Sequence, residues 1–320
     1  IMKKILPALF LTVLSVSSCS TEGGKSLTII HTNDIHGYIA SREAGSKMDA
    51  ANPQRLAGGF AALANLVKRE KGPYLLLDSG DIFSGAPEGS LSKGSSVIEL
   101  MNHLGYTAAA IGNHEFDQKE SNLKRLAKEA KFPLLSANIA LRQPKKGPGA
   151  STTTVTGQIP DYAAPYVVKE IKELNLKVGI FGLITPNTPF VTMPKHVARL
   201  KFLRPVNVAK QMVAELKKQN CNLIIAVTHI GFARENEDFE DEKYLAAQVE
   251  GIDVVLGGHT HTYLKEAHQD PVHKTIVVQS GRYLTSATHL RLSLDESGKV
   301  AKYDSKLQDL WVDELGEDAD

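Results

Sequence analysis

The sequence predicts an α/β fold in which two mixed β-sheets pack against each other and helices flank them, an αββα sandwich in a single domain. Strand-like apolar runs alternate with helical patterns in the first half of the chain, and strand-like runs dominate after residue 275. With 320 residues, of which 42% are hydrophobic, the chain is long enough for a full core. Its net charge of +1 gives no electrostatic argument for binding a nucleic-acid duplex.

The N-terminus is predicted to be a targeting segment and is excluded from the fold. Lys3 and Lys4 precede an apolar run over residues 5–16, which is too short to span a bilayer well. The following Ser17-Ser18-Cys19 resembles a bacterial lipobox. Residues 1–19 would then be a lipoprotein signal peptide, with Cys19 lipidated and the new N-terminus. A plain cleaved signal peptide is the alternative.

The lipobox interpretation predicts an exported lipoprotein that is anchored to the membrane. Ser20 after the cysteine favours the outer membrane, and hence the periplasm, if the cell has two membranes. Residues 20–26 would be a tether, 27–308 the folded domain and 309–320 an acidic tail that we expect to fray. Cys221 would be the one remaining thiol, so we expect no internal disulfide and assign it no role.

The first half of the domain is predicted to alternate strands and helices. Short apolar runs predict strands over residues 27–30, 74–77, 107–111 and 133–137. Apolar residues at helical spacing predict helices over 55–69, 95–104 and 121–130. Because strands and helices alternate, we expect a parallel sheet with covering helices.

The second half contains one connection and then mostly strands. Residues 141–160, rich in Gly, Pro, Lys and Thr, predict a surface loop, and not a domain boundary because candidate ligands lie on both sides. Residues 166–171 and 177–184 predict a hairpin. Helices are expected over 206–218 and 242–249, and strands over 223–227, 254–256, 276–278, 287–294 and 300–307.

Five polar patches each follow a strand-like run. They are Asp34-Ile35-His36, Gly80-Asp81, Gly112-Asn113-His114-Glu115, Thr228-His229 and Gly257-Gly258-His259-Thr260-His261. Ligands of α/β folds bind at the carboxyl ends of strands, so five such ends predict a common metal centre. Carboxylate, amide and imidazole ligands without thiolate suit Zn, Mn or Fe.

The spacing within these patches indicates the chemistry. Asp34 and His36 share one face of an extended segment, and the glycine before Asp81 lets its carboxylate approach a metal closely enough to bridge two cations. Two cations about 3.5–4 Å apart can hold a hydroxide for attack on phosphorus. Asp117 would orient His114 and keep it protonated, so that His114 stabilises the phosphoryl oxygens or protonates the leaving oxygen.

Other residues near the patches have a structural interpretation. His31 is expected to be a buried group or an outer partner of the site, and Glu115 a structural partner near it. Gly58-Gly59 favours close backbone packing over phosphate contact. The histidines outside the motifs, namely His103, His196, His268, His273 and His289, are expected to be solvated or packed.

The segments His31–Gly37, Gly80-Asp81, Gly112–Asp117 and Gly257–His261 resemble the calcineurin-like metallophosphoesterases, and most closely the N-terminal catalytic domain of the 5′-nucleotidases. The resemblance covers residues 27–307. It implies two divalent metal ions and the catalytic pair His114 and Asp117. It places one metal on Asp34, His36, Asp81 and His261. It places the other on Asp81, Asn113, His229 and His259.

Two departures from the family pattern are visible. His261 stands where many 5′-nucleotidases have Gln, so the preferred metal is open. Those enzymes also have a C-terminal domain that stacks the nucleobase, whereas here the last predicted strand ends at 307. We therefore expect the base-binding half to be absent from this chain, and a separate chain could supply it.

Three functional hypotheses follow. The first is a lipid-anchored two-metal phosphoesterase acting on a small phosphorylated substrate, with nucleoside 5′-monophosphates first and cyclic nucleotides or nucleotide sugars as alternatives. The second is the catalytic subunit of a two-chain nucleotidase. The third is a binding lipoprotein that captures its ligand through the metals without turnover, although pure capture would need neither His114 nor Asp117.

Overall fold

The computed structural model describes residues 24–144, 153–155, 157–232 and 240–318. Cys19 and the predicted signal peptide lie outside these ranges, and most of the predicted tether does as well, so they remain predictions. Within the described ranges, no helix has both the length and the apolar character needed to cross a bilayer.

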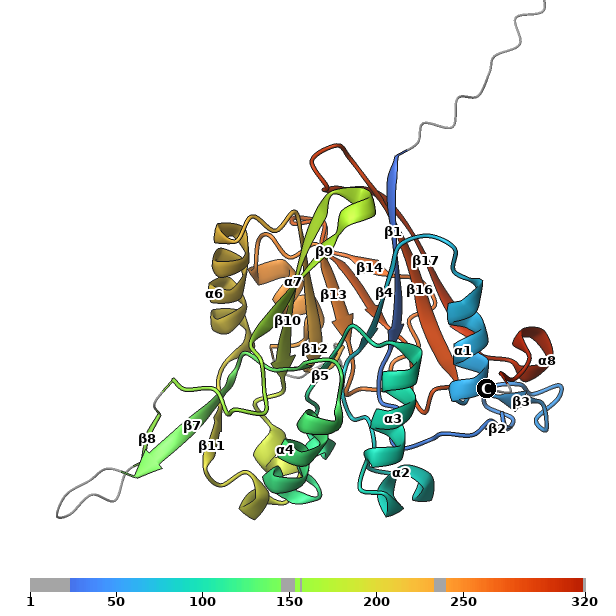
Figure 1. The fold of residues 1–320 in the computed structure, drawn as a ribbon, viewed down its shortest axis with the longest axis horizontal. Helices are drawn as coiled ribbons and strands as arrows, with labels where there is room; N and C mark the ends of the chain where they lie inside the picture. The colour runs from blue at the N-terminus through green and yellow to red at the C-terminus, as the bar shows by residue number, and fades with distance from the viewer. Residues whose placement is uncertain (1–23, 145–152, 156, 233–239, 319–320) are drawn as a thin grey trace, which may run out of the picture.

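Two six-stranded sheets form the centre of the fold (Figure 1). The strands of the first are β1 (Lys25–Thr32), β4 (Tyr74–Asp78), β5 (Ala108–Ala110), β6 (Leu134–Leu135), β16 (Ser286–Leu294) and β17 (Val300–Asp309). Their order is β17-β16-β1-β4-β5-β6. The four strands from β1 to β6 are parallel, while β16 and β17 add an antiparallel edge.

The second sheet repeats this mixed arrangement. Its strands are β9 (Tyr166–Ile171), β10 (Leu176–Ile184), β12 (Leu223–His229), β13 (Val254–Gly257), β14 (His268–Gln269) and β15 (Ile276–Gln279). Their order is β14-β15-β13-β12-β10-β9. The predicted hairpin of β9 and β10 is confirmed, and the central strands β10, β12, β13 and β15 are parallel.

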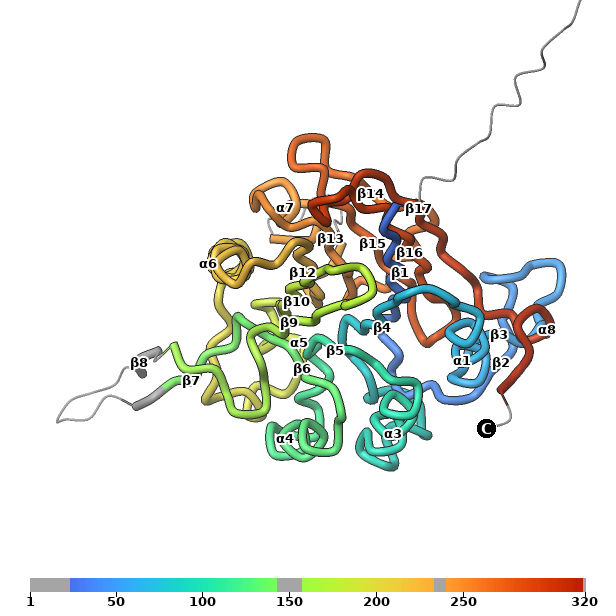
Figure 2. The backbone as a smooth tube through the Cα atoms, turned by 45° about the horizontal axis from the view of Figure 1, so that its top comes forward, coloured from blue at the N-terminus to red at the C-terminus, as the bar shows by residue number. Residues whose placement is uncertain are grey.

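Helices cover the outer face of each sheet. Figure 2 shows α3 and α4 on one side of the paired sheets and α6 and α7 on the other. The first sheet is covered by α1 (Phe60–Arg69), α3 (Ser95–Leu104) and α4 (Lys119–Glu129). The second is covered by α6 (Pro205–Lys218) and α7 (Glu242–Gln248). Shorter helices are α2 (Pro87–Leu91), α5 (Thr188–Val191), α8 (Val312–Leu315), η1 (His114–Phe116), η2 (Lys172–Leu174) and η3 (Pro194–His196).

Three apolar cores hold these layers together, and β4 shows why. Successive strand residues point to opposite faces. Leu75 and Leu77 therefore lie in the core between the two sheets, while Leu76 lies in the core beneath the helices of the first sheet. A sheet buried on both faces needs such continuous apolar runs. The predicted αββα sandwich is confirmed.

One predicted helix begins later than expected. The helix predicted from residue 55 starts at Phe60, and Leu56 instead lies in the short strand β3 (Leu56–Ala57), paired with β2 (Arg42–Glu43). Gly58 and Gly59 both have positive φ, and a Cβ on Gly59 would lie 2.6 Å from the backbone nitrogen of Ser41. This tight backbone packing, expected for the glycine pair, prevents the helix from extending backward.

Two other predictions need correction. The stretch 141–160 is not all loop, because β7 (Ile139–Pro144) pairs with β8 (Thr153–Val155) and with β11 (Leu200–Phe202). Residues 145–152 lie outside the described ranges.

The acidic tail is not frayed over α8. Leu315 is buried there, and Asp313 lies 2.8 Å from Arg55, so apolar contact and an ion pair hold the segment.

Candidate metal centre and catalytic pair

The predicted ligands lie together just beyond the carboxyl ends of the strands that precede them. Potential ligand atoms form three overlapping groups: Asp34, His36 and His261; His36, Asp81 and His114; and Asp81, His229 and His259. Within each group these atoms lie within 4.8 Å of one another. Since the groups share His36 and Asp81, they form one continuous cluster that draws on both sheets.

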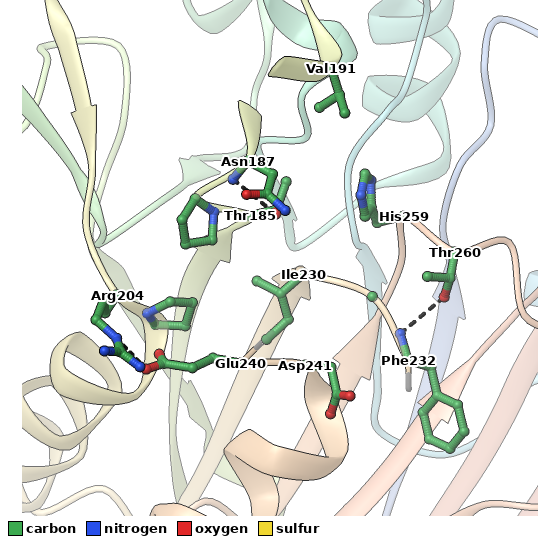
Figure 3. Close-up of a pocket in the computed structure, with 13 residues that line it drawn as sticks. Thr185, Asn187, Val191, Arg204, Ile230, Phe232, Glu240, Asp241, His259 and Thr260 are labelled. Atoms are coloured by element: carbon green, nitrogen blue, oxygen red, sulfur yellow. Dashed lines mark hydrogen bonds and ion pairs between the residues drawn. The ribbon is translucent and has the colours of Figure 1, made fainter. Parts of the chain in front are cut away.

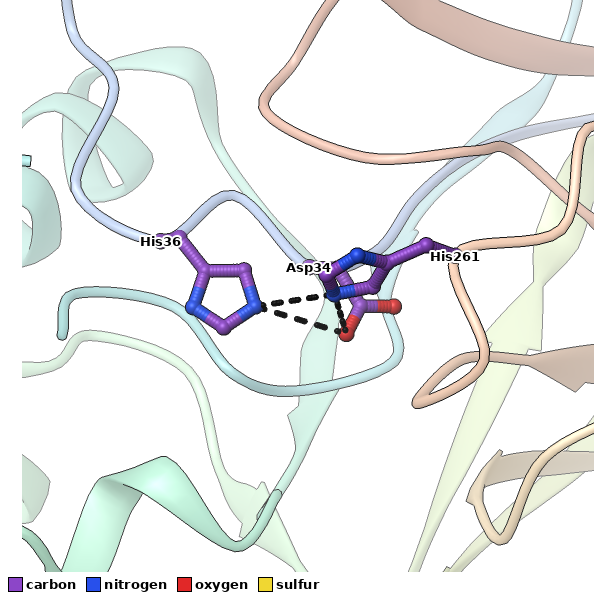
Figure 4. A group of neighbouring side chains, drawn as sticks. All are labelled: Asp34, His36 and His261. Carbon is purple, nitrogen blue, oxygen red and sulfur yellow. Dashed lines mark hydrogen bonds and ion pairs between the residues drawn. The ribbon is translucent and has the colours of Figure 1, made fainter. Parts of the chain in front are cut away.

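The first group converges on the carboxylate of Asp34 (Figure 4). Asp34 Oδ1 lies 3.2 Å from His261 Nε2 and 3.7 Å from His36 Nε2. The two Nε2 atoms are 3.1 Å apart. His36 Nδ1 donates a hydrogen bond to the carbonyl of Ser84 at 2.7 Å, which fixes the ring so that Nε2 faces the group.

Asp81 belongs to both the second and the third group. Its Oδ2 lies 3.0 Å from His229 Nε2 and 3.8 Å from His36 Nε2, so the carboxylate stands between the two imidazoles. His229 Nδ1 donates to the carbonyl of Ser79 at 2.7 Å, which again turns Nε2 inward. The ring of His259 completes the third group, with its centroid 5.0 Å from that of His229.

The hydrogen bonding of the potential metal-ligand atoms also supports a cation site, independently of the distances between them. Asp34 Oδ1, Asn113 Oδ1 and His229 Nε2 are buried, and none makes a hydrogen bond within the described part of the chain. Asp34 Oδ1 and His229 Nε2 each lie beside an ionisable group, His261 and Asp81 respectively, whereas Asn113 Oδ1 has no such contact within these residues. Buried polar atoms without partners are costly and rare. Divalent cations would satisfy all three, and the mixed oxygen and nitrogen donors suit Zn, Mn or Fe.

Backbone strain is concentrated at the same residues. Asp34, His36, Asp81, His259 and His261 all have φ between 51° and 78°. Side chains other than glycine rarely adopt this left-handed conformation, and where they do the strain often marks a functional site. The turns after the strands thus aim these side chains inward at a local cost.

The protonation states show how strongly these groups interact. Burial alone would raise the pKa of Asp34 and Asp81, but the facing imidazoles outweigh it and hold both pKa values well below their usual range. Burial would lower the pKa of His229, yet the neighbouring Asp81 raises it to about 10. Without metal the cluster therefore binds protons tightly, and a metal ion must displace them.

The predicted catalytic pair is in contact. His114 Nδ1 lies 2.7 Å from Asp117 Oδ2, and this hydrogen bond raises the pKa of His114 to about 9 although partial burial opposes it. Asp117 also accepts hydrogen bonds from Ser84 Oγ at 2.6 Å and Thr192 Oγ1 at 3.0 Å, so its carboxylate is fixed. The imidazole is thereby held as a cation at the edge of the cluster.

Two residues expected to be structural do support the site. Glu115 is buried, and its carboxylate accepts hydrogen bonds from the backbone N–H groups of Asp81, Ile82 and Gly112 at 2.7–2.8 Å. It therefore ties the turns after β4 and β5 together. His31 is buried between the hydroxyls of Ser79 and Ser280, and burial lowers its pKa to about 3, so it is neutral.

A second buried carboxylate, Glu242, has a role like that of Glu115 and was not predicted from the sequence. Glu242 is fully buried, and its Oε1 accepts hydrogen bonds from the backbone N–H groups of Gly231 and Gly258, both at 3.1 Å. Gln279 Nε2 donates to its Oε2 at 3.1 Å. Glu242 thus connects the turns that carry His229 and His259. No local pattern marks it, because a glutamate at a helix start is usually solvated.

A cleft of about 660 Å³ lies beside His259 (Figure 3). Val191, Ile230 and Phe232 contribute apolar surface to its lining, while Arg204 supplies a cation paired with Glu240. The cleft is not predictable from local sequence patterns, because its walls come from separate segments. Its volume is suited to a small organic ligand that reaches the metal centre.

The chain is similar to known phosphoesterases over most of its length. The calcineurin-like phosphoesterase family pattern matches residues 27–263. The 5′-nucleotidase of Homo sapiens is 36% identical over 317 residues, covering 92% of this chain and 51% of that protein. The snake venom 5′-nucleotidase of Gloydius brevicauda is 38% identical over 268 residues, covering 81% and 41%. The chain spans about half the length of the curated relatives it matches.

Solved structures also superpose on this chain over most of its length. The 5′-nucleotidase precursor of Thermus thermophilus superposes with a TM-score of 0.76 at 27% identity, over 92% of this chain and 56% of that one. The calcineurin-like phosphoesterase YfkN of Bacillus subtilis superposes with a TM-score of 0.72 over 90% of this chain and 91% of that one. At 24% identity, this second likeness concerns the fold alone.

Proposed function

This chain belongs to the calcineurin-like phosphoesterase family, and from that membership we propose that it hydrolyses nucleotides, with nucleoside 5′-monophosphates as the first substrates to test. The family and the 5′-nucleotidase relatives make it a metal-dependent phosphoric ester hydrolase with a dinuclear divalent metal centre. The observation that carries the proposal is the position of Asp81 between His36 and His229. Nearby lie buried oxygen and nitrogen atoms that could bind a metal and that make no hydrogen bond within the described part of the chain.

We assign the metal ligands as follows. Asp81 would be shared by both ions, because its Oδ2 lies between His36 Nε2 of one proposed ligand set and His229 Nε2 of the other. One ion would be held by Asp34, His36, Asp81 and His261, and the other by Asp81, Asn113, His229 and His259. When bound, such ions activate a water molecule for attack and stabilise charge on the phosphoryl oxygens. The distances and buried atoms support the assignment without deciding between Mn, Zn and Fe.

His114 is the proposed catalytic residue of the chain itself. Its cationic imidazole stabilises the developing charge on the phosphoryl oxygens or passes its proton to the leaving oxygen. Asp117 holds the ring by the 2.7 Å hydrogen bond and keeps it protonated. A protein that only captured a ligand would need no such pair, so the contact argues against the binding-lipoprotein hypothesis.

The cleft beside His259 supports a substrate larger than phosphate. A nucleoside whose phosphate lies at the metal centre could place its ring against Ile230 and Phe232. The names of the curated relatives support nucleotides as the class. Cyclic nucleotides and nucleotide sugars use the same chemistry and are the alternative substrates.

Export and a lipid anchor at Cys19 are also part of the proposal, supported by the lipobox pattern. Labelling of cells with a radioactive fatty acid tests it. We expect label in the wild-type protein and none in a Cys19→Ser variant. Unlabelled wild-type protein in the membrane-free fraction would leave the plain signal peptide as the explanation.

The alternative to a single-chain enzyme is a two-chain nucleotidase, in which a separate chain completes recognition of the base. It is motivated by relatives that are about twice as long as the matched region. Crosslinking in the natural lysate, followed by mass spectrometry, tests it. A specific partner recovered in proportion to this chain supports the two-chain enzyme, and recovery of the monomer alone argues against it.

A rate panel tests the central proposal. The protein is stripped of metal, reloaded with Mn²⁺ or Zn²⁺, and assayed on 5′-AMP, 2′,3′-cyclic AMP, a nucleotide sugar and bis(p-nitrophenyl) phosphate. We expect weak binding of 5′-AMP and broad tolerance of the leaving group by this chain alone, whereas fast, selective hydrolysis of 5′-AMP would mean that the single domain forms its own base pocket. Activity restricted to the activated diester would show a working metal centre whose specificity lies with another substrate or with a missing partner chain.

A further inference from the structure

The segment around the end of α5 presents apolar side chains to solvent beside the catalytic pair. Phe190, Val191 and Met193 are 86%, 42% and 50% exposed. They are three of the nine exposed large apolar side chains of the described residues, and they fall within four consecutive positions. Single exposed apolar residues are ordinary, whereas a cluster of them often marks a binding surface. These three residues are called the apolar rim below.

Two hydrogen bonds fasten the rim to the turn that carries the catalytic pair. Thr192, in the middle of the rim, donates from Oγ1 to Asp117 Oδ1 at 3.0 Å. Four residues further along, His196 donates from Nδ1 to the carbonyl of Phe116 at 3.0 Å. Because the carboxylate of Asp117 also holds His114, this one carboxylate connects the rim to the catalytic imidazole.

The backbone on both sides of the rim is held in place. Thr188, at the start of α5, is buried and donates from Oγ1 to the carbonyl of Thr185 at 2.7 Å. The N–H of Thr185 donates in turn to the carbonyl of His229 at 2.9 Å. After the rim, Val197 is buried in the apolar core. The rim therefore has a defined position relative to the metal centre, although its side chains are exposed.

The rim also adjoins the cleft beside His259, because Val191 belongs to both (Figure 3). His114 acts on the phosphoryl group or on the leaving oxygen, so the leaving group of a substrate begins beside the catalytic pair. The rim is the apolar surface that Thr192 connects to that pair. A leaving group that extends from the metal centre toward the cleft therefore passes along the rim.

We propose that the apolar rim binds the leaving group of the phosphate ester, and that the centre prefers esters whose alcohol carries a flat apolar ring. The inference rests on the proposed function and names the part of the substrate that the rim selects. A ring placed against Phe190 removes apolar surface of both partners from water. Because the rim covers a ring on one side only, its contribution is modest and does not depend on one particular base.

Three esters of primary alcohols test the rim, namely benzyl phosphate, 5′-AMP and ethyl phosphate. We expect Phe190→Ser to lower kcat/KM about tenfold on the first two, which carry a ring, and by less than about twofold on ethyl phosphate. Phe190→Tyr keeps the ring and should keep the wild-type values. Val272→Ser is the matched control, because this side chain is 72% exposed, lies in the turn before β15 and should change none of the three.

Thr192→Val separates the rim from the catalytic pair. Loss of the hydroxyl that donates to Asp117 should lower kcat about tenfold on all three esters and leave each KM within about twofold of wild type. Thr192→Ser keeps the donor and should restore kcat. If Phe190→Ser gave this same pattern, with kcat lost on ethyl phosphate as well, the rim would only support Asp117 and the proposal would be overturned.

Unchanged kcat/KM on benzyl phosphate in Phe190→Ser would also overturn the proposal. If Phe232→Ser lowered it instead, the ring would lie in the cleft and not on the rim. Metal content per chain is measured for every variant by mass spectrometry, and we expect the wild-type value because no rim residue is an assigned ligand.

The same panel separates the rim from the proposed function. If wild type hydrolyses benzyl phosphate but not 5′-AMP, and Phe190→Ser loses activity on benzyl phosphate but not on ethyl phosphate, the rim stands and the nucleotide proposal fails. If 5′-AMP is hydrolysed but Phe190→Ser affects it no more than ethyl phosphate, the nucleotide proposal stands and the rim is wrong.

Discussion

Asp81 Oδ2 lies 3.0 Å from His229 Nε2, and this contact joins the two sheets at the metal centre. Asp81 follows β4 of the first sheet, and His229 ends β12 of the second. The turn that carries Asp81 is itself tied to the next one by Glu115. The position of this carboxylate therefore depends on the packing of both sheets, and its removal should affect both proposed metal positions.

Asp81→Asn should abolish tight binding of the metal pair. The amide keeps the size of the side chain but loses the charge that a shared ligand needs. We expect at most one metal ion per chain by elemental analysis, and little gain in melting temperature when Mn²⁺ or Zn²⁺ is added. Asp304→Asn, an exposed change on β17, is the control. Two tightly bound ions in Asp81→Asn would contradict the shared-ligand assignment.

His114→Ala should slow catalysis without loss of metal. Proton transfer or charge stabilisation by a positioned imidazole is worth about 10²- to 10⁴-fold in rate, so kcat on 5′-AMP should fall by that factor. The metal content should stay at the wild-type value, because His114 is not one of the assigned ligands. Full activity in the variant would show that the catalytic assignment is wrong.

The hydrogen bond from His114 to Asp117 predicts how stability depends on pH in the metal-free protein. The folded pKa of about 9 is above the value of 6.5 expected for an unfolded chain. A raised folded pKa contributes stability that is complete below the unfolded pKa and is lost as pH rises through the folded pKa. The stability of wild type relative to Asp117→Asn should therefore be greatest near pH 6 and decrease toward pH 10.

Denaturant unfolding of both metal-free proteins between pH 5.5 and pH 10 measures this difference. A titration of the His114 ring by NMR gives the pKa directly, and it should decrease in Asp117→Asn. A stability difference that stays constant across the range would mean that the pair does not titrate as its geometry indicates.

The sandwich and the ligand patches were predictable because both are local patterns. A buried β-branched run followed by Asp or His is visible in any short window, as at Asp34 and His229. The start of α1 was predicted wrongly because the helical spacing runs backward through Gly58-Gly59, where tertiary packing against Ser41 decides the backbone. A local pattern cannot report such a contact.

The contact between Arg42 and Tyr283, whose ring lies beside His261, could not be predicted for a related reason. Arg42 lies in β2 and Tyr283 lies just before β16, 241 residues apart, yet Arg42 Nη2 donates to the carbonyl of Tyr283 at 2.9 Å. Neither residue belongs to a recognisable motif. Glu242 was missed in the same way, since its partners Gly231 and Gly258 lie in turns whose approach depends on the pairing of β12 with β13.

Glu242 should be important for stability although it is not an assigned ligand. Glu242→Ala would leave the buried N–H groups of Gly231 and Gly258 without an acceptor, at about 1–3 kcal/mol each, so we expect about 3 kcal/mol less free energy of unfolding. Glu242→Gln keeps a side-chain oxygen that can accept from the N–H groups of Gly231 and Gly258, so it should cost less. Denaturant unfolding compares both with Glu250→Ala, an exposed change just beyond α7 that should stay within about 0.5 kcal/mol of wild type. Equal, small effects of all three substitutions would mean that Glu242 does not hold these turns together.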